Sequence, residues 1–174
     1  ARGAALGHPK AREVVDHGMA FLLNGHLDPV NSGFWWSADD AGPLDRKKQA
    51  YGHAFVLLAA AWAAKLGHPD AEKLRDLVMG DLKTHFWEDD PGAVSDTFDE
   101  DWTNPPAYRG GNANMHLNET LLAAYDSWRD PEYLAMARRI AGFMIDQHAR
   151  AEGWVVPEHF TPDWQVDRDF EGDP

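Results

Sequence analysis

A chain of 174 residues, 44% of them hydrophobic, is long enough to bury one core, so we expect a single domain. Its formal net charge of −13 argues against the basic surface that nucleic acid or an anionic membrane requires. Cysteine is absent, which excludes disulfides and thiolate metal sites. The sequence has no long apolar run and no signal-peptide pattern, and we therefore expect a cytoplasmic protein.

Apolar periodicity predicts helices over residues 9–24, 46–66, 71–87, 112–128 and 131–150. Strand-like pieces are expected at 33–37, 93–98 and 152–161. The helix over 46–66 is apolar almost all round, so we expect it to be buried, whereas the helix that follows it is amphipathic. Residues 1–8 are typical of the last turn of a helix, which Gly7 would end.

The chain contains an internal repeat. The segment Leu6-Gly7-His8-Pro9-Lys10-Ala11 recurs 60 residues later as Leu66-Gly67-His68-Pro69-Asp70-Ala71. Each unit combines a buried helix, a tight turn, an amphipathic helix and a strand-like loop. Such hairpins bury their inner faces only by stacking. We therefore predict an all-α toroid in which inner and outer helices alternate, present here as one part of a larger ring.

Two predicted inner helices begin with polar side chains. Asn112, His116 and Glu119 share one face at the start of the second, and Tyr51 and His53 lie in the first. The local alternative is a helix cap, a satisfied core histidine and a solvated glutamate. Inner helices of a toroid run parallel, however, so these turns would meet at one end of the ring. That convergence favours a binding site.

Three segments carry a family resemblance. They are Lys48-Gln49-Ala50-Tyr51-Gly52-His53-Ala54-Phe55, Tyr108-Arg109-Gly110-Gly111-Asn112-Ala113-Asn114-Met115-His116 and Pro157-Glu158-His159-Phe160-Thr161-Pro162-Asp163-Trp164. These segments resemble the N-acylglucosamine 2-epimerase superfamily, most of all its mannose isomerase and sulfoquinovose isomerase branch. The resemblance implies an (α/α)6 barrel of about 400 residues built from stacked helical hairpins. Residues 1–174 would then form a partial barrel, its N-terminal half.

The resemblance implies aldose–ketose isomerisation of a monosaccharide through a cis-enediolate, without a metal or other cofactor. It makes His116 one of two acid–base histidines, and it places Asn112 and Tyr51 against sugar hydroxyls. A second catalytic histidine, a histidine and a glutamate for ring opening, and an arginine would lie outside this sequence. A histidine suits the reaction because its pKa lies near neutrality. Without the other groups, we expect the chain alone to be weakly active or inactive.

Other residues are weaker candidates for substrate contact, and each has a structural alternative. They are His53 (core histidine), Glu119 (partner of His116), Glu158 and His159 (exposed loop) and Trp102 (aromatic core). The sequence has no metal-binding motif and no nucleotide-binding loop, so we expect neither a metal nor a nucleotide.

Several alternative functions remain at this stage. A 2-epimerase would share the enediolate step. A toroid glycoside hydrolase or lyase would need two carboxylates, for which Glu119, Glu158 and the run Asp99–Asp101 are the candidates. A non-catalytic helical-repeat scaffold is the third alternative. Mannose, lyxose, sulfoquinovose and a glucosamine derivative all remain possible sugars.

Overall fold

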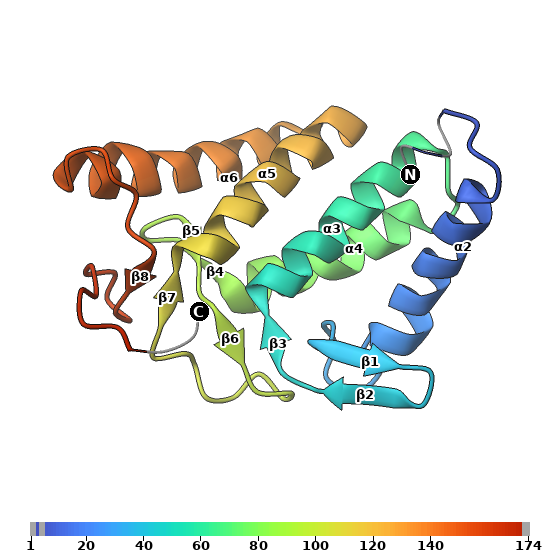
Figure 1. Ribbon diagram of the computed structural model, residues 1–174, viewed down its shortest axis with the longest axis horizontal. Helices are drawn as coiled ribbons and strands as arrows, with labels where there is room; N and C mark the ends of the chain where they lie inside the picture. Colours follow the sequence, from blue (N-terminus) through green and yellow to red (C-terminus); the bar gives the residue numbers. More distant parts are fainter. Residues whose placement is uncertain (1–2, 4–5, 172–174) are drawn as a thin grey trace.

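The computed structural model describes residue 3 and residues 6–171. Its helices follow one another as antiparallel hairpins (Figure 1). The α-helices are α2 (Ala11–Phe21), α3 (Ala50–Lys65), α4 (Ala71–Asp81), α5 (Gly111–Trp128) and α6 (Pro131–Ala141). A π-helical segment continues every second one: η1 (Leu22–His26) after α2, η2 (Leu82–Phe86) after α4 and η3 (Gly142–Ala149) after α6. The outer helices α2, α4 and α6 therefore occupy the same position in the repeat, and each ends in a π-helical segment.

Short antiparallel strand pairs gather at one end of the helices (Figure 1). The pairs are β1 (Ser37–Asp39) with β2 (Gly42–Asp45), β3 (Lys48–Gln49) with β6 (Thr97–Phe98), β4 (Trp87–Glu88) with β5 (Ala93–Val94), and β7 (Arg109–Gly110) with β8 (His159–Phe160). β3 leads directly into α3 and β7 into α5. Both inner helices therefore begin at the same end of the molecule.

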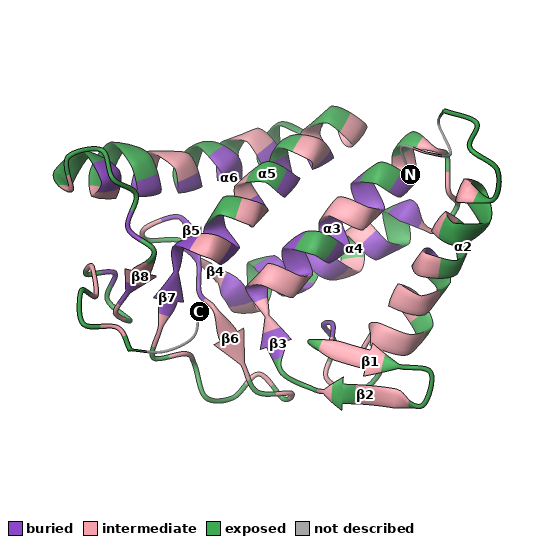
Figure 2. Ribbon diagram, in the orientation of Figure 1, coloured by how far each residue is buried: buried purple, intermediate pink, exposed green. Residues whose placement is uncertain are grey.

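The core lies where inner helices meet each other and their outer partners. α3 packs against α4 and α5, and α5 also packs against α6. Leu57, Leu74, Leu117 and Leu121, which come from three of these helices, have no exposed surface. Eight of the 16 residues of α3 are buried, but Phe55 and Trp62 are exposed, so α3 is less completely buried than its apolar composition predicts, and the outer helices also keep an exposed face (Figure 2). Leu57→Ala would cost about 2–5 kcal/mol, because tight packing leaves a cavity.

The sequence repeat is also a structural repeat. Gly7 and Gly67 have φ values of +73° and +66°, the left-handed conformation that glycine adopts without strain. After each glycine the chain turns into an outer helix, α2 or α4. None of the helices in the described part of the chain is both long and apolar enough to cross a membrane.

Several predicted element ends are wrong. The inner helix predicted from residue 46 begins at Ala50, because the two residues before it pair with β6 as a strand. Asn112 is not the N-cap of α5: Gly110 occupies that position, with an extended φ of −114°. Asn112 is therefore the second residue of the helix.

The strand-like pieces are also shorter than predicted. The stretch 152–161 contributes only β8, and Gly153 turns with a φ of +67°. The stretch 93–98 divides into β5 and β6, and the piece at 33–37 gives a single bridge from Phe34 to Leu27 before β1 begins. Of the helical turn predicted over residues 1–8, positions 1–2 and 4–5 lie outside the described residues.

Candidate active site

The starts of α3 and α5 bring Tyr51 and His116 together. Their ring centroids lie 5.1 Å apart with the planes at 83°, the edge-to-face arrangement that aromatic rings favour. Tyr51 is the second residue of α3, and His116 lies one turn inside α5. The two inner helices therefore place a phenol and an imidazole side by side at one end of the ring.

The two ring nitrogens of His116 have different surroundings. Nδ1 is buried and lies 3.4 Å from a carboxylate oxygen of Glu119, although the geometry is not that of a hydrogen bond. The side chain as a whole keeps 24% of its surface exposed. A carboxylate beside Nδ1 favours the tautomer protonated there, which leaves the lone pair on Nε2. Such an imidazole is able to take a proton from a carbon acid.

Asn112 lies one turn before His116 on α5, and Glu158 contacts the start of this helix. Asn112 is four residues before His116, so the two share one helical face. Its backbone N–H donates to Oε1 of Glu158 at 3.2 Å, and the N–H of Gly111 donates to the Glu158 carbonyl at 2.7 Å. Glu158 therefore closes the start of α5 and keeps its carboxylate beside Asn112.

His159 is held by aromatic neighbours. Its Nδ1 lies 2.9 Å from the hydroxyl of Tyr108, and its ring stacks on Phe170 at 4.3 Å. Burial, together with nearby carboxylates, raises the pKa of Tyr108 to about 12, so the phenol stays protonated. Burial likewise raises the pKa of Asp96, one of those carboxylates. The contacts that fix His159 thus come from Tyr108 and Phe170.

His53 does not reach the site. Its side chain is fully buried, its Nε2 accepts from the backbone N–H of Phe34 at 3.0 Å, and its Nδ1 donates to the carbonyl of Gln49 at 2.7 Å. Burial lowers its pKa to about 3, with a smaller contribution from the positive charge of Lys48. Both ring nitrogens are therefore occupied by backbone. This geometry corrects the expectation that His53 contacts substrate.

Trp102 also lies away from His116. Its ring stacks on His85 at 3.9 Å and 6°, and its indole N–H donates to the Asn31 carbonyl at 2.7 Å. A Cβ on Gly33, which has a φ of +73°, would lie 2.4 Å from this indole, so only glycine fits there. Trp102 therefore belongs to the packing around His53, which corrects its assignment to the substrate site.

Trp36 and Phe55 are further aromatic neighbours of the site, and sequence reasoning missed Phe55. Trp36 lies 6.0 Å from Tyr51, and Phe55 lies 4.9 Å from His116, measured between ring centroids. Phe55 keeps 38% of its surface exposed. The signal for Phe55 was its position four residues after Tyr51, since that spacing puts both rings on one face of α3.

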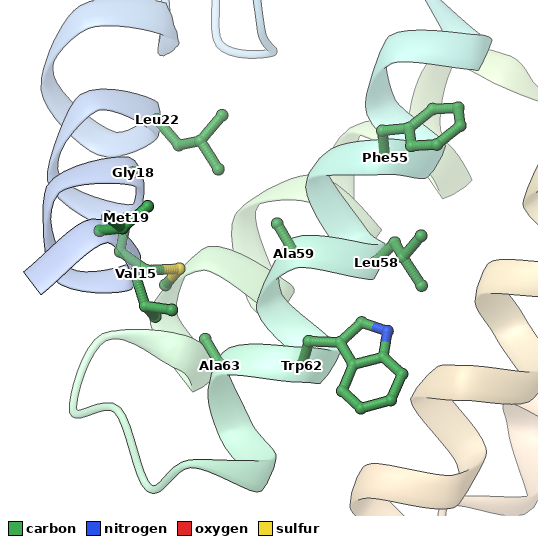
Figure 3. A pocket seen from close by; sticks show the side chains of 10 residues that line it. Val15, Gly18, Met19, Leu22, Phe55, Leu58, Ala59, Trp62 and Ala63 are labelled. Carbon is green, nitrogen blue, oxygen red and sulfur yellow. The ribbon is translucent and has the colours of Figure 1, made fainter. Parts of the chain in front are cut away.

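An apolar hollow of about 520 Å³ lies between α2 and α3, and Phe55, the neighbour of His116, also lines it (Figure 3). Its lining includes Val15, Met19 and Leu22 from the outer side and Ala59 and Ala63 from α3. The described residues that line it carry no titratable side chain, so we place the chemistry at His116 instead. Within the described residues, no cluster of three or more metal-binding side chains of the His, Cys, Asp and Glu types is found.

The chain is similar to sugar-converting enzymes. It is 42% identical over 175 residues to a D-mannose isomerase of Thermobifida fusca, and the match covers 98% of this chain and 43% of that protein. It is 34% identical over 92 residues to a cellobiose 2-epimerase of Dictyoglomus turgidum, covering 52% of this chain and 23% of that one. The chain thus spans less than half the length of these relatives.

The fold comparison agrees with the sequence comparison. A crystal structure of a D-mannose isomerase superposes with a TM-score of 0.85 at 35% identity, covering 94% of this chain and 44% of that one. This likeness confirms the predicted fold, a partial (α/α)6 barrel. The family description N-acylglucosamine 2-epimerase (GlcNAc 2-epimerase) matches residues 1–174. The chain belongs to the N-acylglucosamine 2-epimerase family.

Proposed function

We propose that the protein interconverts an aldose and its ketose, with D-mannose and D-fructose as the first pair to test. The observation that carries this proposal is the meeting of His116 with Tyr51 at 5.1 Å, beside Asn112 on the same helix. The family and the 42% identity to a D-mannose isomerase support the sugar class. Residues 1–174 supply one part of a single barrel domain in this proposal.

The chemistry begins with proton transfer from carbon. Nε2 of His116 takes the proton from C2 of the open-chain aldose, and the electron pair of that C–H bond forms the C1–C2 double bond of an enediolate. The C1 carbonyl oxygen takes the negative charge and gains a proton to become a hydroxyl, O2 loses its proton and becomes the ketone oxygen, and a proton is added to C1 to give the ketose. No electron acceptor is required, because the reaction is a redistribution within one molecule. The positive N-terminal end of α5 favours the developing enediolate oxygen.

The remaining polar groups bind and orient the sugar. The side chains of Asn112 and Tyr51 contact hydroxyl groups, and Glu158 contributes a carboxylate at the same helix start. Glu119 lies beside Nδ1 of His116 and orients the ring, so that Nε2 faces the substrate. His159 contributes indirectly, because it contacts Tyr108 in the segment that leads into α5.

A 2-epimerase is the second candidate, favoured by the 34% identity to a cellobiose 2-epimerase. An epimerase makes the same enediolate but returns the proton to the opposite face of C2. Product identity therefore separates the two activities, since mannose gives fructose in one case and glucose in the other.

The test uses the protein expressed from its full reading frame beside the 174-residue chain, each with mannose in deuterated water. The proposal predicts fructose as the product and loss of the C2 proton signal of mannose in NMR spectra. Glucose with deuterium at C2 would favour the epimerase. If no aldose loses its C2 proton, both activities are excluded. We expect the 174-residue chain alone to turn over substrate weakly or not at all.

A further inference from the structure

The starts of α3 and α5 are built to the same plan (Figure 1). A two-residue strand precedes each helix and pairs with a two-residue strand from the next loop, β3 with β6 and β7 with β8. The first helical N–H then donates to the carbonyl of the residue just before that partner strand. These bonds run from Ala50 to Asp96 at 2.9 Å and from Gly111 to Glu158 at 2.7 Å.

An ion pair fixes the strand in front of each helix, fully buried before α3 and partly buried before α5. Lys48 has no exposed surface, and its Nζ donates to Asp28 at 2.9 Å and to the Ser32 carbonyl at 2.8 Å. In front of α5, both the Nε and a terminal nitrogen of Arg109 bind the carboxylate of Glu88. Asp28 and Glu88 are 60 residues apart, each two residues beyond a π-helical segment.

A buried polar side chain fixes the first turn itself. Asn114 is fully buried, and its amide donates to the Gly110 carbonyl at 2.9 Å and to the Val94 carbonyl at 3.0 Å. Its oxygen accepts from the N–H of Val94 at 2.9 Å. His53 makes the equivalent bonds on α3. Its Nδ1 donates to the carbonyl of Gln49, four residues earlier, and its Nε2 accepts from the N–H of Phe34. Phe34 and Val94 are again 60 residues apart.

We propose that Asn114, together with the Glu88–Arg109 pair, is a positioning device that sets the rotation of α5 and so holds His116 against Tyr51. This inference rests on the proposed function for its effect on turnover. Asn114 and His116 are two residues apart, hence about 200° apart around the helix axis. Asn114 therefore binds the loop at Val94 on one face of α5, while His116 lies against Tyr51 on the opposite face.

The size of the effect follows from helix geometry. A side-chain tip about 5–6 Å from the axis moves by about 2 Å when a helix rotates by about 20°. A misplacement of about 1 Å at a reacting group is able to cost about 10²-fold in rate. Releasing the amide of Asn114 should therefore lower kcat far more than it changes KM for the sugar.

The experiment compares Asn114→Leu with a matched control, Thr120→Val, in the protein from its full reading frame. Thr120 is a buried polar residue of the same helix that we place outside the site. Two quantities are measured: the ¹H shifts of the His116 ring, which the nearby Tyr51 ring current displaces, and kcat with KM for mannose. The N114L protein should lose the displaced shifts and about 10²-fold in kcat, whereas the T120V protein should keep both.

If N114L does not fold, E88Q tests the same device, because it keeps the shape of Glu88 but weakens the pair with Arg109. Displaced His116 shifts that stay unchanged in a folded N114L or E88Q protein would overturn the inference, whatever the activity. A protein without any isomerase activity would overturn the proposed function instead, and the ring shifts would still decide the role of Asn114.

Discussion

His53 and His116 both lie near the start of an inner helix, yet the structure gives them opposite surroundings. His53 faces the loop behind α3, is fully buried and has both nitrogens bound to backbone. His116 faces Tyr51, keeps 24% of its side chain exposed and has no hydrogen bond at Nδ1 within the described structure. The residue type is the same, and the helical face decides its role.

The repeat performs two tasks at each of the inner helices α3 and α5. The rear face anchors the helix through His53 or Asn114, and the front face presents side chains to the ring interior. Tyr51 and Phe55 occupy on α3 the positions that Asn112 and His116 occupy on α5. The anchor is thus repeated, whereas the chemistry depends on which residues face inward.

Replacing the front histidine should give the largest effect. His116→Asn removes the proposed base, and we expect kcat to fall by roughly 10²- to 10⁴-fold, the usual contribution of a general base. The melting temperature should stay close to that of the unchanged protein, because the side chain keeps 24% of its surface exposed and has no hydrogen bond at Nδ1 within the described structure. Steady-state kinetics and thermal melts check the two parts. A large loss of stability with normal kcat would reverse the assignment.

Replacing the rear histidine should act on stability instead. His53→Leu leaves the N–H of Phe34 buried without a partner, at about 1–3 kcal/mol, and removes the bond from the ring to the Gln49 carbonyl. His53→Asn keeps one donor and one acceptor, so the loss should be smaller. Denaturant unfolding of the two variants measures the difference. Equal loss in both would mean that packing, and not these hydrogen bonds, explains the effect of His53.

The stability that His53 contributes should also depend on pH. The pKa of His53 falls from 6.5 to about 3 on folding, so between these values the unfolded chain binds more protons. The contribution of His53 to the free energy of unfolding is complete above about pH 6.5. It falls by about 1.4 kcal/mol per pH unit as the pH falls toward 3. The difference in stability between the unchanged protein and His53→Asn should shrink over this range. A constant difference would contradict a neutral, buried His53.

The smallest effect is expected at Glu119. Its carboxylate lies 3.4 Å from Nδ1 of His116 but is 65% exposed, so solvent weakens the interaction. Glu119→Gln should lower kcat by only about 3- to 10-fold, which corresponds to about 1 kcal/mol. The pH profile of kcat provides the measurement, and an acidic limb that shifts in the variant would show that the carboxylate acts through the histidine. A loss as large as that of His116→Asn would make Glu119 a catalytic group in its own right.

Sequence reasoning found what short-range patterns encode. The Leu6 and Leu66 segments and the apolar stretch before Leu66 were sufficient to predict stacked hairpins with buried inner helices. The start of α3 was misplaced because a strand as short as Lys48–Gln49 shows no alternating pattern, and only its pairing with β6 defines it.

Long-range contacts explain what the sequence did not reveal at the site. The burial of His53 depends on Phe34, which lies 19 positions away in another loop. The pairing of Glu88 with Arg109 joins residues 21 positions apart. Trp102 differs from its expected position for the same reason: its neighbours His85 and Asn31 come from other parts of the chain.

The most direct test of the central claim is proton exchange at C2 of mannose in deuterated water, followed by NMR. Three proteins from the full reading frame are compared: unchanged, His116→Asn, and His68→Asn, which makes the same substitution at a hairpin turn outside the site. We predict C2 exchange by the unchanged protein and by H68N, and its loss in H116N. Exchange at an undiminished rate in the H116N protein would contradict the assignment of His116 as the base.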